Sequence, residues 1–210
     1  MAVEVNWFGH ASFRIAGAGG VAYIDPWKLD IEPHDANVVI VSHSHYDHCS
    51  SLDVQKVCRS GTAVLTPVDA VATLPAAQAV SPGQRLTFGG IVVETVAAYN
   101  VREVYHPRGK NWIGVVISLD GKRIYYAGDT DLINEMGSLR DVDLALLPVG
   151  GTYTMDAAAA AKACHAIGCK LAVPYHWGDV VGSEADARQF LRELVGCEGR
   201  ILQRGQSLTL

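Results

Sequence analysis

Several apolar segments of this chain end in a residue of a type that binds metals in proteins. The segment NVVIV is followed within two residues by His43, VETVAAY by Asn100, RIYYAG by Asp129 and LAVPY by His176. Apolar, β-branched runs of this length are typical of buried strands. Strand ends of a packed sheet meet at one edge, where loops carry functional residues on a rigid scaffold. The chain is therefore predicted to fold around sheets that collect metal-type side chains at one edge.

One short segment concentrates these side chains. Residues 42–48 read SHSHYDH and place His43, His45, Asp47 and His48 within six positions. With 8 His residues in a chain of 210, chance would produce this pattern with a probability on the order of 10⁻³, a low false-positive risk for a motif. A polar surface loop would explain this cluster alone, but not the other strand ends. The pattern therefore favours a metal site.

The residue types indicate the metals and their number. Imidazole and carboxylate groups together suit zinc, iron or manganese. Alternation along the chain lets His43 and His45 leave the strand end on the same side, whereas Asp47 and His48 follow one turn later and face a second position. An Asp129 oxygen can bridge two cations, and cations ~3.5–4 Å apart can share a hydroxide and polarise a carbonyl or phosphoryl oxygen. The segment of residues 42–48 can therefore supply ligands to two metals at once.

A structural zinc is the alternative use of such a cluster. Structural zinc sites close all four positions and usually use cysteine. The five cysteines of the chain are irregularly spaced and form no CxxC motif, whereas His176 can complete the second metal position. We therefore expect one or two divalent transition metals as cofactors, with zinc favoured and manganese or iron as alternatives.

The hydrophobic pattern predicts many strands first and helices later. A type I′ turn dipeptide, Asp120-Gly121, marks the clearest hairpin, and Ser183 is a predicted N-cap. The layout indicates sheets covered by helices within one domain, residues 1–210. Strands are expected at 3–8, 12–15, 21–25, 37–43, 62–67, 143–151 and 171–177, hairpins at 85–100, 111–130 and 201–210, and helices at 51–59, 156–167 and 183–194.

Composition limits the possible partners and compartments. Apolar residues make up 49% of the chain, charged residues 19%, and the net charge is −5 without any basic cluster. Nucleic acid is an unfavourable partner, because phosphate binding needs concentrated positive charge. The first ten residues do not resemble a signal peptide, and no apolar run reaches the ~20 residues of a membrane span. We expect a cytoplasmic protein with reduced thiols and a small-molecule substrate.

A series of motifs, in a fixed order, resembles one known family. FGHASFRI, YIDPW, SHSHYDH, YYAGDTD, LPVGGTYTM and VPYHWGD follow one another over almost the whole chain. The chain resembles the metallo-β-lactamase superfamily, in a branch of small metal-dependent hydrolases related to L-ascorbate-6-phosphate lactonase and N-acyl-phosphatidylethanolamine phospholipase D. The resemblance implies a four-layer αββα sandwich of mixed sheets, with helices outside and metals at one sheet edge. By motif match, it implies the metal ligands His43, His45, Asp47, His48, Asp129 and His176.

The chain departs from the family pattern at one strand end. Most of the superfamily has a histidine where this chain has Asn100, so the first metal position keeps only His43, His45 and the bridging Asp129. Asparagine offers a neutral and weaker carbonyl oxygen. His106 follows six residues later in YHPRG and is the other candidate for the third ligand. The departure bears on whether both metal positions fill.

Three further residues are candidates with an ordinary alternative each. His10 matches a family position near the metals and is expected to contact the substrate or a ligand; the alternative is a histidine hydrogen-bonded at a strand end. Asp25 is expected to accept hydrogen bonds from the metal loop or a ligand histidine, or else to be a turn residue before Pro26. Tyr153 is expected in a wall of the cleft, or else in an ordinary loop.

The expected function is that of a metal-dependent hydrolase. A metal lowers the pKa of bound water toward ~7, and the resulting hydroxide would attack an ester, lactone, amide or phosphodiester. Asp47 and Asp129 would hold metal and orient or receive the proton. Two alternatives remain open: an oxidoreductase that carries iron in the same fold, and a metal-stabilised binding module without catalysis. The sequence does not favour a serine hydrolase, because the chain has no G-x-S-x-G motif.

Overall fold

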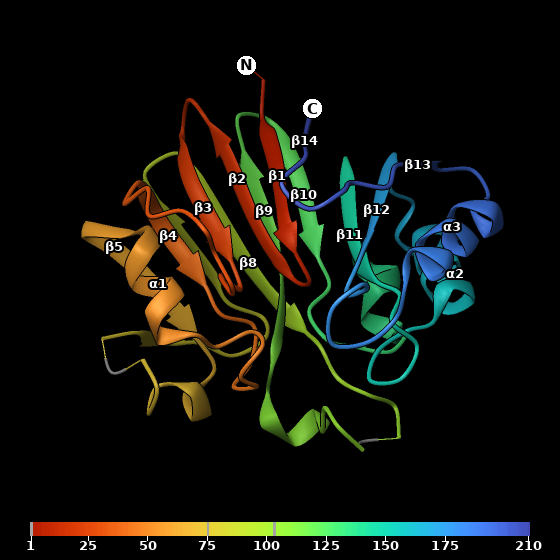
Figure 1. Ribbon diagram of the computed structural model, residues 1–210, viewed down its shortest axis with the longest axis horizontal. Helices are drawn as coiled ribbons and strands as arrows, with labels where there is room; N and C mark the ends of the chain where they lie inside the picture. The colour runs from red at the N-terminus through yellow and green to blue at the C-terminus, as the bar shows by residue number, and fades with distance from the viewer. Residues whose placement is uncertain (1, 75, 103) are drawn as a thin grey trace.

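The computed structural model describes residues 2–74, 76–102 and 104–210. Two sheets of seven strands each lie face to face, and helices cover their outer faces (Figure 1). The first sheet has the order β14-β1-β2-β3-β4-β5-β6 and the second the order β13-β12-β11-β10-β9-β8-β7. This arrangement is the four-layer αββα sandwich that the sequence predicts.

The strands of the first sheet are β1 (Glu4–Gly9), β2 (Ser12–Gly17), β3 (Gly20–Ile24), β4 (Ala36–Ile40), β5 (Cys58–Thr66), β6 (Gln78–Ala79) and β14 (Ser207–Thr209). Those of the second are β7 (Arg85–Phe88), β8 (Ile91–Ala97), β9 (Ile113–Leu119), β10 (Lys122–Tyr126), β11 (Leu144–Pro148), β12 (Leu171–Tyr175) and β13 (Glu198–Gly199). The α-helices are α1 (Ser51–Val57), α2 (Ala157–Ile167) and α3 (Glu184–Glu193), and the short 3₁₀ helices are η1 (Val68–Ala70), η2 (Arg108–Lys110) and η3 (Asn134–Ser138).

Apolar side chains of both sheets share one buried core. Ile15 of the first sheet and Val115 of the second are fully buried in the same cluster. A smaller cluster joins Val39 of β4 to Val54 of α1, so α1 covers the outer face of the first sheet. Helices α2 and α3 contact β11 and β12 on the outer face of the second sheet. Burial of these faces, at roughly 25 cal/mol per Å² of apolar surface, is what fixes the layers.

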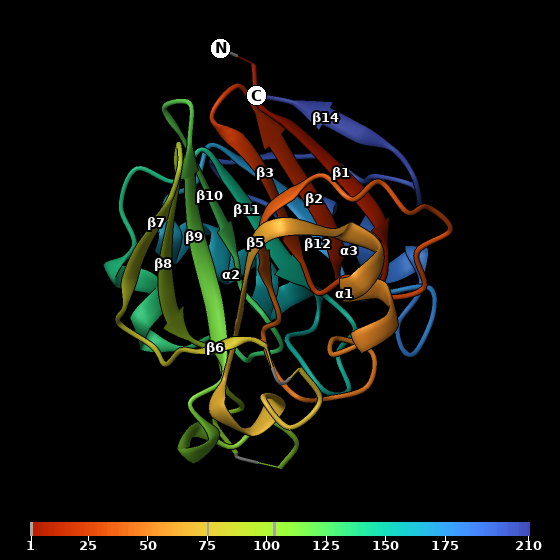
Figure 2. The same cartoon turned by 90° about the vertical axis from the view of Figure 1, so that its left-hand side faces the viewer.

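Strand direction brings four strand ends to one end of the sandwich. In the second sheet β10, β11 and β12 pair in parallel, and β8 runs in the direction of β10 because both pair antiparallel with β9. In the first sheet β4 is parallel to β3 and β5. The loops that follow β4, β8 and β10 meet at the end opposite the chain termini, as the two views agree (Figure 1, Figure 2). Apart from His10 and His176, which follow β1 and β12, the candidate ligands lie on these loops.

Helices α2 and α3 begin and end within one residue of their predicted bounds, whereas α1, predicted over 51–59, ends at Val57 because β5 begins at Cys58. Asp156 accepts a hydrogen bond from the backbone of Ala159 at the start of α2, and Gly168 ends this helix in a left-handed conformation. Ser183 and Asp186 form a capping box at the start of α3. No helix among the described residues has the length and apolar character needed to cross a membrane.

The prediction of a hairpin at 201–210 is wrong. Only Ser207–Thr209 forms a strand there, β14, and it pairs antiparallel with β1, where Glu4 lies opposite Thr209. The edge of the first sheet at β1 offers unpaired backbone groups, and β14 satisfies them. Residues 203–206 make a turn, with the Gln206 N–H donating to the Gln203 carbonyl, but its two arms do not pair with each other.

Candidate metal centre

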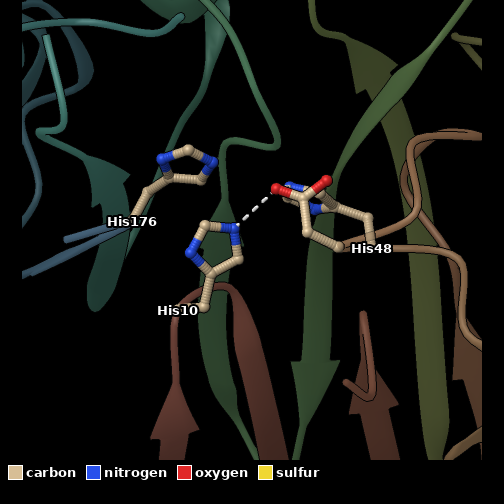
Figure 3. A group of neighbouring side chains, drawn as sticks. His10, His48 and His176 are labelled. Atoms are coloured by element: carbon tan, nitrogen blue, oxygen red, sulfur yellow. Dashed lines mark hydrogen bonds and ion pairs between the residues drawn. The ribbon is translucent and has the colours of Figure 1, made fainter. Parts of the chain in front are cut away.

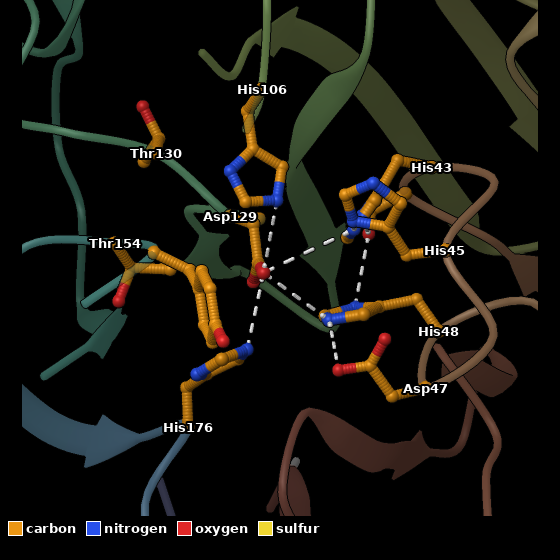
Figure 4. A network of polar contacts seen from close by, with 12 residues as sticks. His43, His45, Asp47, His48, His106, Asp129, Thr130, Thr154 and His176 are labelled. Carbon is orange, nitrogen blue, oxygen red and sulfur yellow. Dashed lines mark hydrogen bonds and ion pairs between the residues drawn. The ribbon is translucent and has the colours of Figure 1, made fainter. Parts of the chain in front are cut away.

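The loop after β4 folds back on itself and directs its side chains into the end of the sandwich. The carbonyl of His45 accepts hydrogen bonds from the backbone N–H groups of His48, at 3.1 Å, and of Cys49, at 2.8 Å. This turn places His43, His45, Asp47 and His48 around one space (Figure 4). The sequence spacing alone predicts two facing positions, and the turn is the local structure that produces them.

The first group, which we call the three-histidine cluster, consists of His43, His45 and His106. Their ring nitrogens lie within 4.8 Å of one another, and His43 Nε2 is 3.1 Å from His45 Nδ1. The ring of Trp112 packs against all three, with centroid distances of 4.9, 4.8 and 5.5 Å. The sequence pattern predicts Trp112 only as part of the hairpin at 111–130. It does not predict that this ring forms an apolar wall beside the histidines.

Asn100 does not point into the cluster but orients His106. Its Oδ1 atom accepts hydrogen bonds from the backbone N–H of His106 and from the ring Nδ1 of the same residue, both at 3.0 Å. Its Nδ2 donates to Asp131 and to the Tyr153 carbonyl. Because Nδ1 of His106 must carry the proton to donate, Nε2 is left with a free lone pair toward the site. Of the two candidates for the third position, His106 is the one that the fold brings to His43 and His45.

The second group, the mixed cluster, consists of His10, Asp47, His48 and His176. One donor atom of each lies within 4.8 Å of the others. His10 Nε2 is 2.9 Å from Asp47 Oδ2, and the rings of His10 and His176 are 4.2 Å apart. Figure 3 shows the imidazoles of His10, His48 and His176 arranged around a common space. His10 thus lies among the donor atoms of the cluster and contacts the candidate ligand Asp47 directly.

Asp129 lies between the two clusters. Its Oδ2 atom is 3.1 Å from Nε2 of His176, 3.3 Å from that of His106 and 3.4 Å from that of His48. The Nε2 atom of His43 lies 3.9 Å away. These contacts radiate from a single carboxylate oxygen (Figure 4). This is the place from which one carboxylate can serve both clusters.

Several donor atoms of the site have no hydrogen-bond partner among the described residues. Within the described residues, Nε2 of His48, His106 and His176 and Oδ1 of Asp129 are buried and have no hydrogen-bond partner. Buried polar atoms are almost always hydrogen-bonded, because leaving one unpaired costs ~1–3 kcal/mol. Four such atoms in one place fit the insertion of a cation that accepts their lone pairs. The residues present therefore fit a metal of the imidazole- and carboxylate-binding type.

Burial and mutual charge set the protonation of the metal-free site. Burial, with repulsion from His48, lowers the pKa of His43 well below 6.5. Burial opposes the charged form of His48, but the carboxylates of Asp129 and Asp25 outweigh it and raise the pKa of His48 well above 6.5. Burial likewise opposes ionised Asp129, but His176 and His48 hold its pKa well below 3.8. His43 and Asp129 are thus already in the form that binds metal, whereas His48 must lose a proton.

Asp25 supports the loop of residues 42–49 from beneath. Its carboxylate accepts hydrogen bonds from the backbone N–H of Ser42, at 2.6 Å, and from the Tyr126 hydroxyl, at 2.6 Å. Its Oδ2 lies 2.7 Å from Nδ1 of His48. A hydrogen bond at Nδ1 fixes the ring so that Nε2 faces the site. The alternative, a simple turn residue before Pro26, does not account for these contacts.

Three residues of the site have left-handed backbone conformations. The φ angles are 48° at His10, 43° at Asp25 and 62° at His176. Non-glycine residues in this region are uncommon and cost of order 1 kcal/mol or more, and they cluster at functional sites. The hydrogen bond from the His176 N–H to the His10 carbonyl, at 3.0 Å, holds two of them together across the sheets. The fold therefore spends stability to point these side chains inward.

The site opens into a cavity of about 230 Å³ with apolar and aromatic walls. Tyr46, Tyr105, Tyr153 and Val180 form these walls, and the rings of Tyr105 and Tyr153 contact each other at 4.7 Å. Tyr153 lies where the sequence analysis placed it. The sequence does not predict the other three wall residues, Tyr46, Tyr105 and Val180. They come together only through the paths of three separate loops.

A different cluster, formed by sulfur atoms, lies away from this cavity. Cys164, Cys169 and Cys197 bring their Sγ atoms within 4.8 Å of one another. The irregular spacing of the cysteines in the sequence, without a CxxC motif, does not predict this cluster. All five cysteines of the chain are free thiols.

A two-sheet αββα sandwich with histidines and aspartates at one sheet edge defines the metallo-β-lactamase class of fold. The family model described as "Beta-lactamase superfamily domain" matches residues 4–176. A relative from Nitratidesulfovibrio vulgaris, named UPF0173 metal-dependent hydrolase, is 32% identical over the whole chain and 96% of its own length. The chain therefore belongs to the metallo-β-lactamase superfamily and, within it, to the UPF0173 group of metal-dependent hydrolases.

Solved structures agree with this placement. A proposed metal-dependent hydrolase from Parabacteroides distasonis is 29% identical, with a TM-score of 0.84 over 96% of this chain and 94% of the other. The diiron β-hydroxylase CmlA from Streptomyces venezuelae shares the fold, with a TM-score of 0.78 and 15% identity over all of this chain and 54% of its own. At this low identity, the second likeness extends to the fold alone.

Proposed function

We propose that this chain hydrolyses a small ester, lactone or amide, or more weakly a phosphodiester, with one or two divalent transition metals held by its histidines and aspartates. Zinc is the favoured metal, with manganese or iron as alternatives. The observation that carries the proposal is the set of partnerless donor atoms on His48, His106, His176 and Asp129, all buried around one space. The family's metal-dependent relatives support it.

The geometry suggests how the ligands divide between two positions. The three-histidine cluster would hold one metal, with Asp129 as its carboxylate. Asp47, His48 and His176 would hold the second, with Asp129 shared. His10 Nε2 is already engaged with Asp47 Oδ2 at 2.9 Å, so we assign His10 to positioning Asp47.

A bound metal of this kind supplies Lewis acidity and lowers the pKa of water to near neutrality. The remaining tasks fall to the protein. The carboxylate of Asp47, which His10 holds at 2.9 Å, is placed to accept the proton that the attacking water gives up. His48 is held by Asp25 at 2.7 Å and keeps its Nε2 toward the site. The aromatic walls exclude bulk water, which strengthens each electrostatic contact inside.

The cavity walls indicate the class of substrate. None of the nine described residues that line this cavity is lysine or arginine. A negatively charged group of a substrate needs a paired cation when it leaves water, and the walls offer aromatic and apolar surface instead. Tyr46 is 69% exposed and Tyr105 46% exposed, so both present apolar area at the mouth. The group next to the scissile bond should therefore be uncharged and apolar.

A matched pair of esters tests both parts of this proposal. 4-Nitrophenyl butyrate and 4-nitrophenyl 4-sulfobutyrate share a leaving group and differ by one sulfonate, a charged group that does not attack the neighbouring ester. We expect zinc-loaded protein to hydrolyse the butyrate at least about tenfold faster in kcat/KM, since one unpaired charge costs more than 1.4 kcal/mol. Asp129→Asn should abolish both rates. Equal rates would refute the substrate class, and no metal-dependent rate on any ester, amide or phosphodiester would refute the hydrolase itself.

An iron-carrying oxidoreductase is the second candidate. The donor set in the two clusters contains only imidazole and carboxylate groups, and iron accepts both as readily as zinc does. Elemental analysis of protein purified from cells grown with both metals separates the candidates. Iron at stoichiometric level, together with zinc-loaded protein that hydrolyses nothing, would favour the oxidoreductase.

A further inference from the structure

Three cysteines from separate segments meet on the helical side of the second sheet. Cys164 lies in the last turn of α2, Cys169 in the connection to β12, and Cys197 between α3 and β13. Cys164 and Cys169 are buried, whereas Cys197 is partly exposed. The Sγ atoms of Cys169 and Cys197 are 3.4 Å apart, and all three Sγ atoms lie within 4.8 Å of one another.

These spacings match those of sulfur atoms that share one metal ion. An ion with tetrahedral geometry and metal–sulfur bonds of about 2.3 Å holds its sulfur ligands about 3.8 Å apart. The one Sγ pair with a hydrogen-bond contact, Cys169 and Cys197, is 3.4 Å apart, and no Sγ pair of the three exceeds 4.8 Å, so the group is compact enough for one ion. Thiolate donors select soft ions such as zinc and monovalent copper, whereas calcium and magnesium prefer oxygen. The ligand type thus differs from that of the candidate metal centre, which offers nitrogen and oxygen.

Two simpler explanations account for less of the geometry. A disulfide would join two sulfur atoms at about 2.05 Å and leave the third thiol without a role. Buried cysteines also pack as small apolar side chains, and that alone would explain Cys164 and Cys169. A thiol–thiol hydrogen bond accounts for the 3.4 Å contact between Cys169 and Cys197, but neither explanation accounts for the approach of all three sulfur atoms to within 4.8 Å of one another.

We propose that Cys164, Cys169 and Cys197 form a second, thiolate metal site that binds a thiophilic divalent ion such as zinc, with the fourth position open toward solvent. Cys169 precedes β12 and His176 follows it, so the site lies about 20 Å from the candidate metal centre, at about 3.3 Å per residue of strand. The ion would tie the end of α2 to the start of β12 and to the segment after α3. These segments lie together on the outer side of the second sheet (Figure 1), so the site would stabilise the helical layer.

Cadmium titration of the full chain tests the proposal, because cadmium–thiolate bonds absorb in the ultraviolet whereas bonds to histidine and aspartate do not. The protein is reduced, freed of metal and titrated with cadmium alone. We expect charge-transfer absorption whose amplitude at saturation corresponds to one thiolate-bound cadmium ion per chain, whatever amount of cadmium the other centre takes up. Asp129→Ala should keep this absorption, since it changes only the other centre.

Cysteine variants decide whether the three thiols are responsible. Cys197→Ser should remove at least about a third of the absorption, since one of three cadmium–sulfur bonds is lost, and weaken cadmium binding about tenfold or more. Cys58→Ser, another partly exposed cysteine outside the cluster, should leave both unchanged. Circular dichroism verifies that each variant is folded, and the partial exposure of Cys197 makes its replacement a mild one. Absence of charge-transfer absorption in the wild type, or its persistence in Cys197→Ser, would overturn the proposal.

Discussion

Asn100 Oδ1 lies 3.0 Å from Nδ1 of His106, and Nε2 of the same ring lies 3.3 Å from Asp129. The residue at the strand end thus holds in place an imidazole from six positions further along the chain. Asn100 also fixes the backbone at His106, because its Oδ1 accepts the N–H of that residue. A position where the family has a histidine is here used to orient one.

We expect His106, and not the residue at position 100, to supply the third imidazole of the three-histidine cluster. His106→Ala should empty the three-histidine cluster of metal, lowering the total by about one ion, because only His43, His45 and the shared Asp129 then remain of its four ligands. Asn100→His should not raise the metal content, since His106 already fills the place. Metal titration of both variants, with elemental analysis, measures this. Two tightly bound ions in His106→Ala, with affinities like those of the wild type, would contradict the assignment.

Asn100 itself should matter through orientation. Asn100→Ala removes the acceptor for Nδ1 of His106, so the ring loses its preferred tautomer and direction. Loss of such a supporting hydrogen bond typically weakens metal binding or activity ~10–100-fold. We expect a reduction in first-site zinc affinity within that range, with the fold retained. The exposed variant Val101→Ala, next in sequence, is the control and should bind zinc normally.

Asp129 should contribute more to activity than His10. Asp129 Oδ2 lies near the Nε2 atoms of four histidines, whereas His10 is held to Asp47 alone by a hydrogen bond through its ring. We expect His10→Ala to lower kcat/KM ~10–100-fold at saturating metal and Asp129→Ala to lower it about tenfold further. Steady-state kinetics with 4-nitrophenyl butyrate measure the two losses. Equal or reversed losses would refute the ranking.

The lowered pKa of the Asp47 carboxyl should be measurable in the pH dependence of the free energy of unfolding. Burial opposes its ionisation, but the hydrogen bond with His10 outweighs burial and lowers the pKa of Asp47 from 3.8 to about 2. A carboxyl with a depressed folded pKa stabilises the fold above its unfolded pKa, and this contribution is lost as the pH falls from about 4 to about 2. In metal-free protein, Asp47→Asn should therefore lose less stability than the wild type over that interval.

Urea denaturation at several pH values measures this difference. Asp141→Asn replaces an exposed carboxyl and is the matched control, expected to follow the wild-type curve. If Asp47→Asn also follows the wild-type curve, the hydrogen bond with His10 does not stabilise the ionised carboxylate.

The support beneath the metal loop should be measurable as stability. Tyr126 is fully buried and its hydroxyl donates to Asp25 at 2.6 Å. Tyr126→Phe keeps the ring and removes the donor to a charged acceptor, so the free energy of unfolding should fall by about 1.5–3 kcal/mol. Chemical denaturation measures it. Tyr46→Phe, at a 69% exposed residue, should change stability by less than about 0.5 kcal/mol.

The strand ends were predictable because their signal is local. An apolar run of five residues followed by His43 or His176 states both the strand and the point where it stops. Parallel and alternating strand directions then bring such ends together, so the family resemblance and the strand pattern lead to the same sheet edge. The αββα layers follow from the same pattern, because each sheet needs a covering for its apolar outer face.

What escaped prediction depends on contacts between distant segments. The strand Ser207–Thr209 looks like one arm of a hairpin, and only the free edge of β1 makes it pair elsewhere. Tyr105 and Trp112 reach the histidines through the path of the loop after β8, which no local spacing encodes. Cys164, Cys169 and Cys197 meet because α2, β12 and the segment after α3 are neighbours in space.

The left-handed backbone at His10, Asp25 and His176 sets a trade-off for anyone who engineers this protein. Glycine adopts this conformation without strain. A selection for heat resistance alone would therefore favour variants in which glycine replaces one of these three residues. Each of those variants would lose an imidazole or the carboxylate that orients one. A thermostable library sorted without a test of metal content would therefore enrich proteins that fold well and do no chemistry.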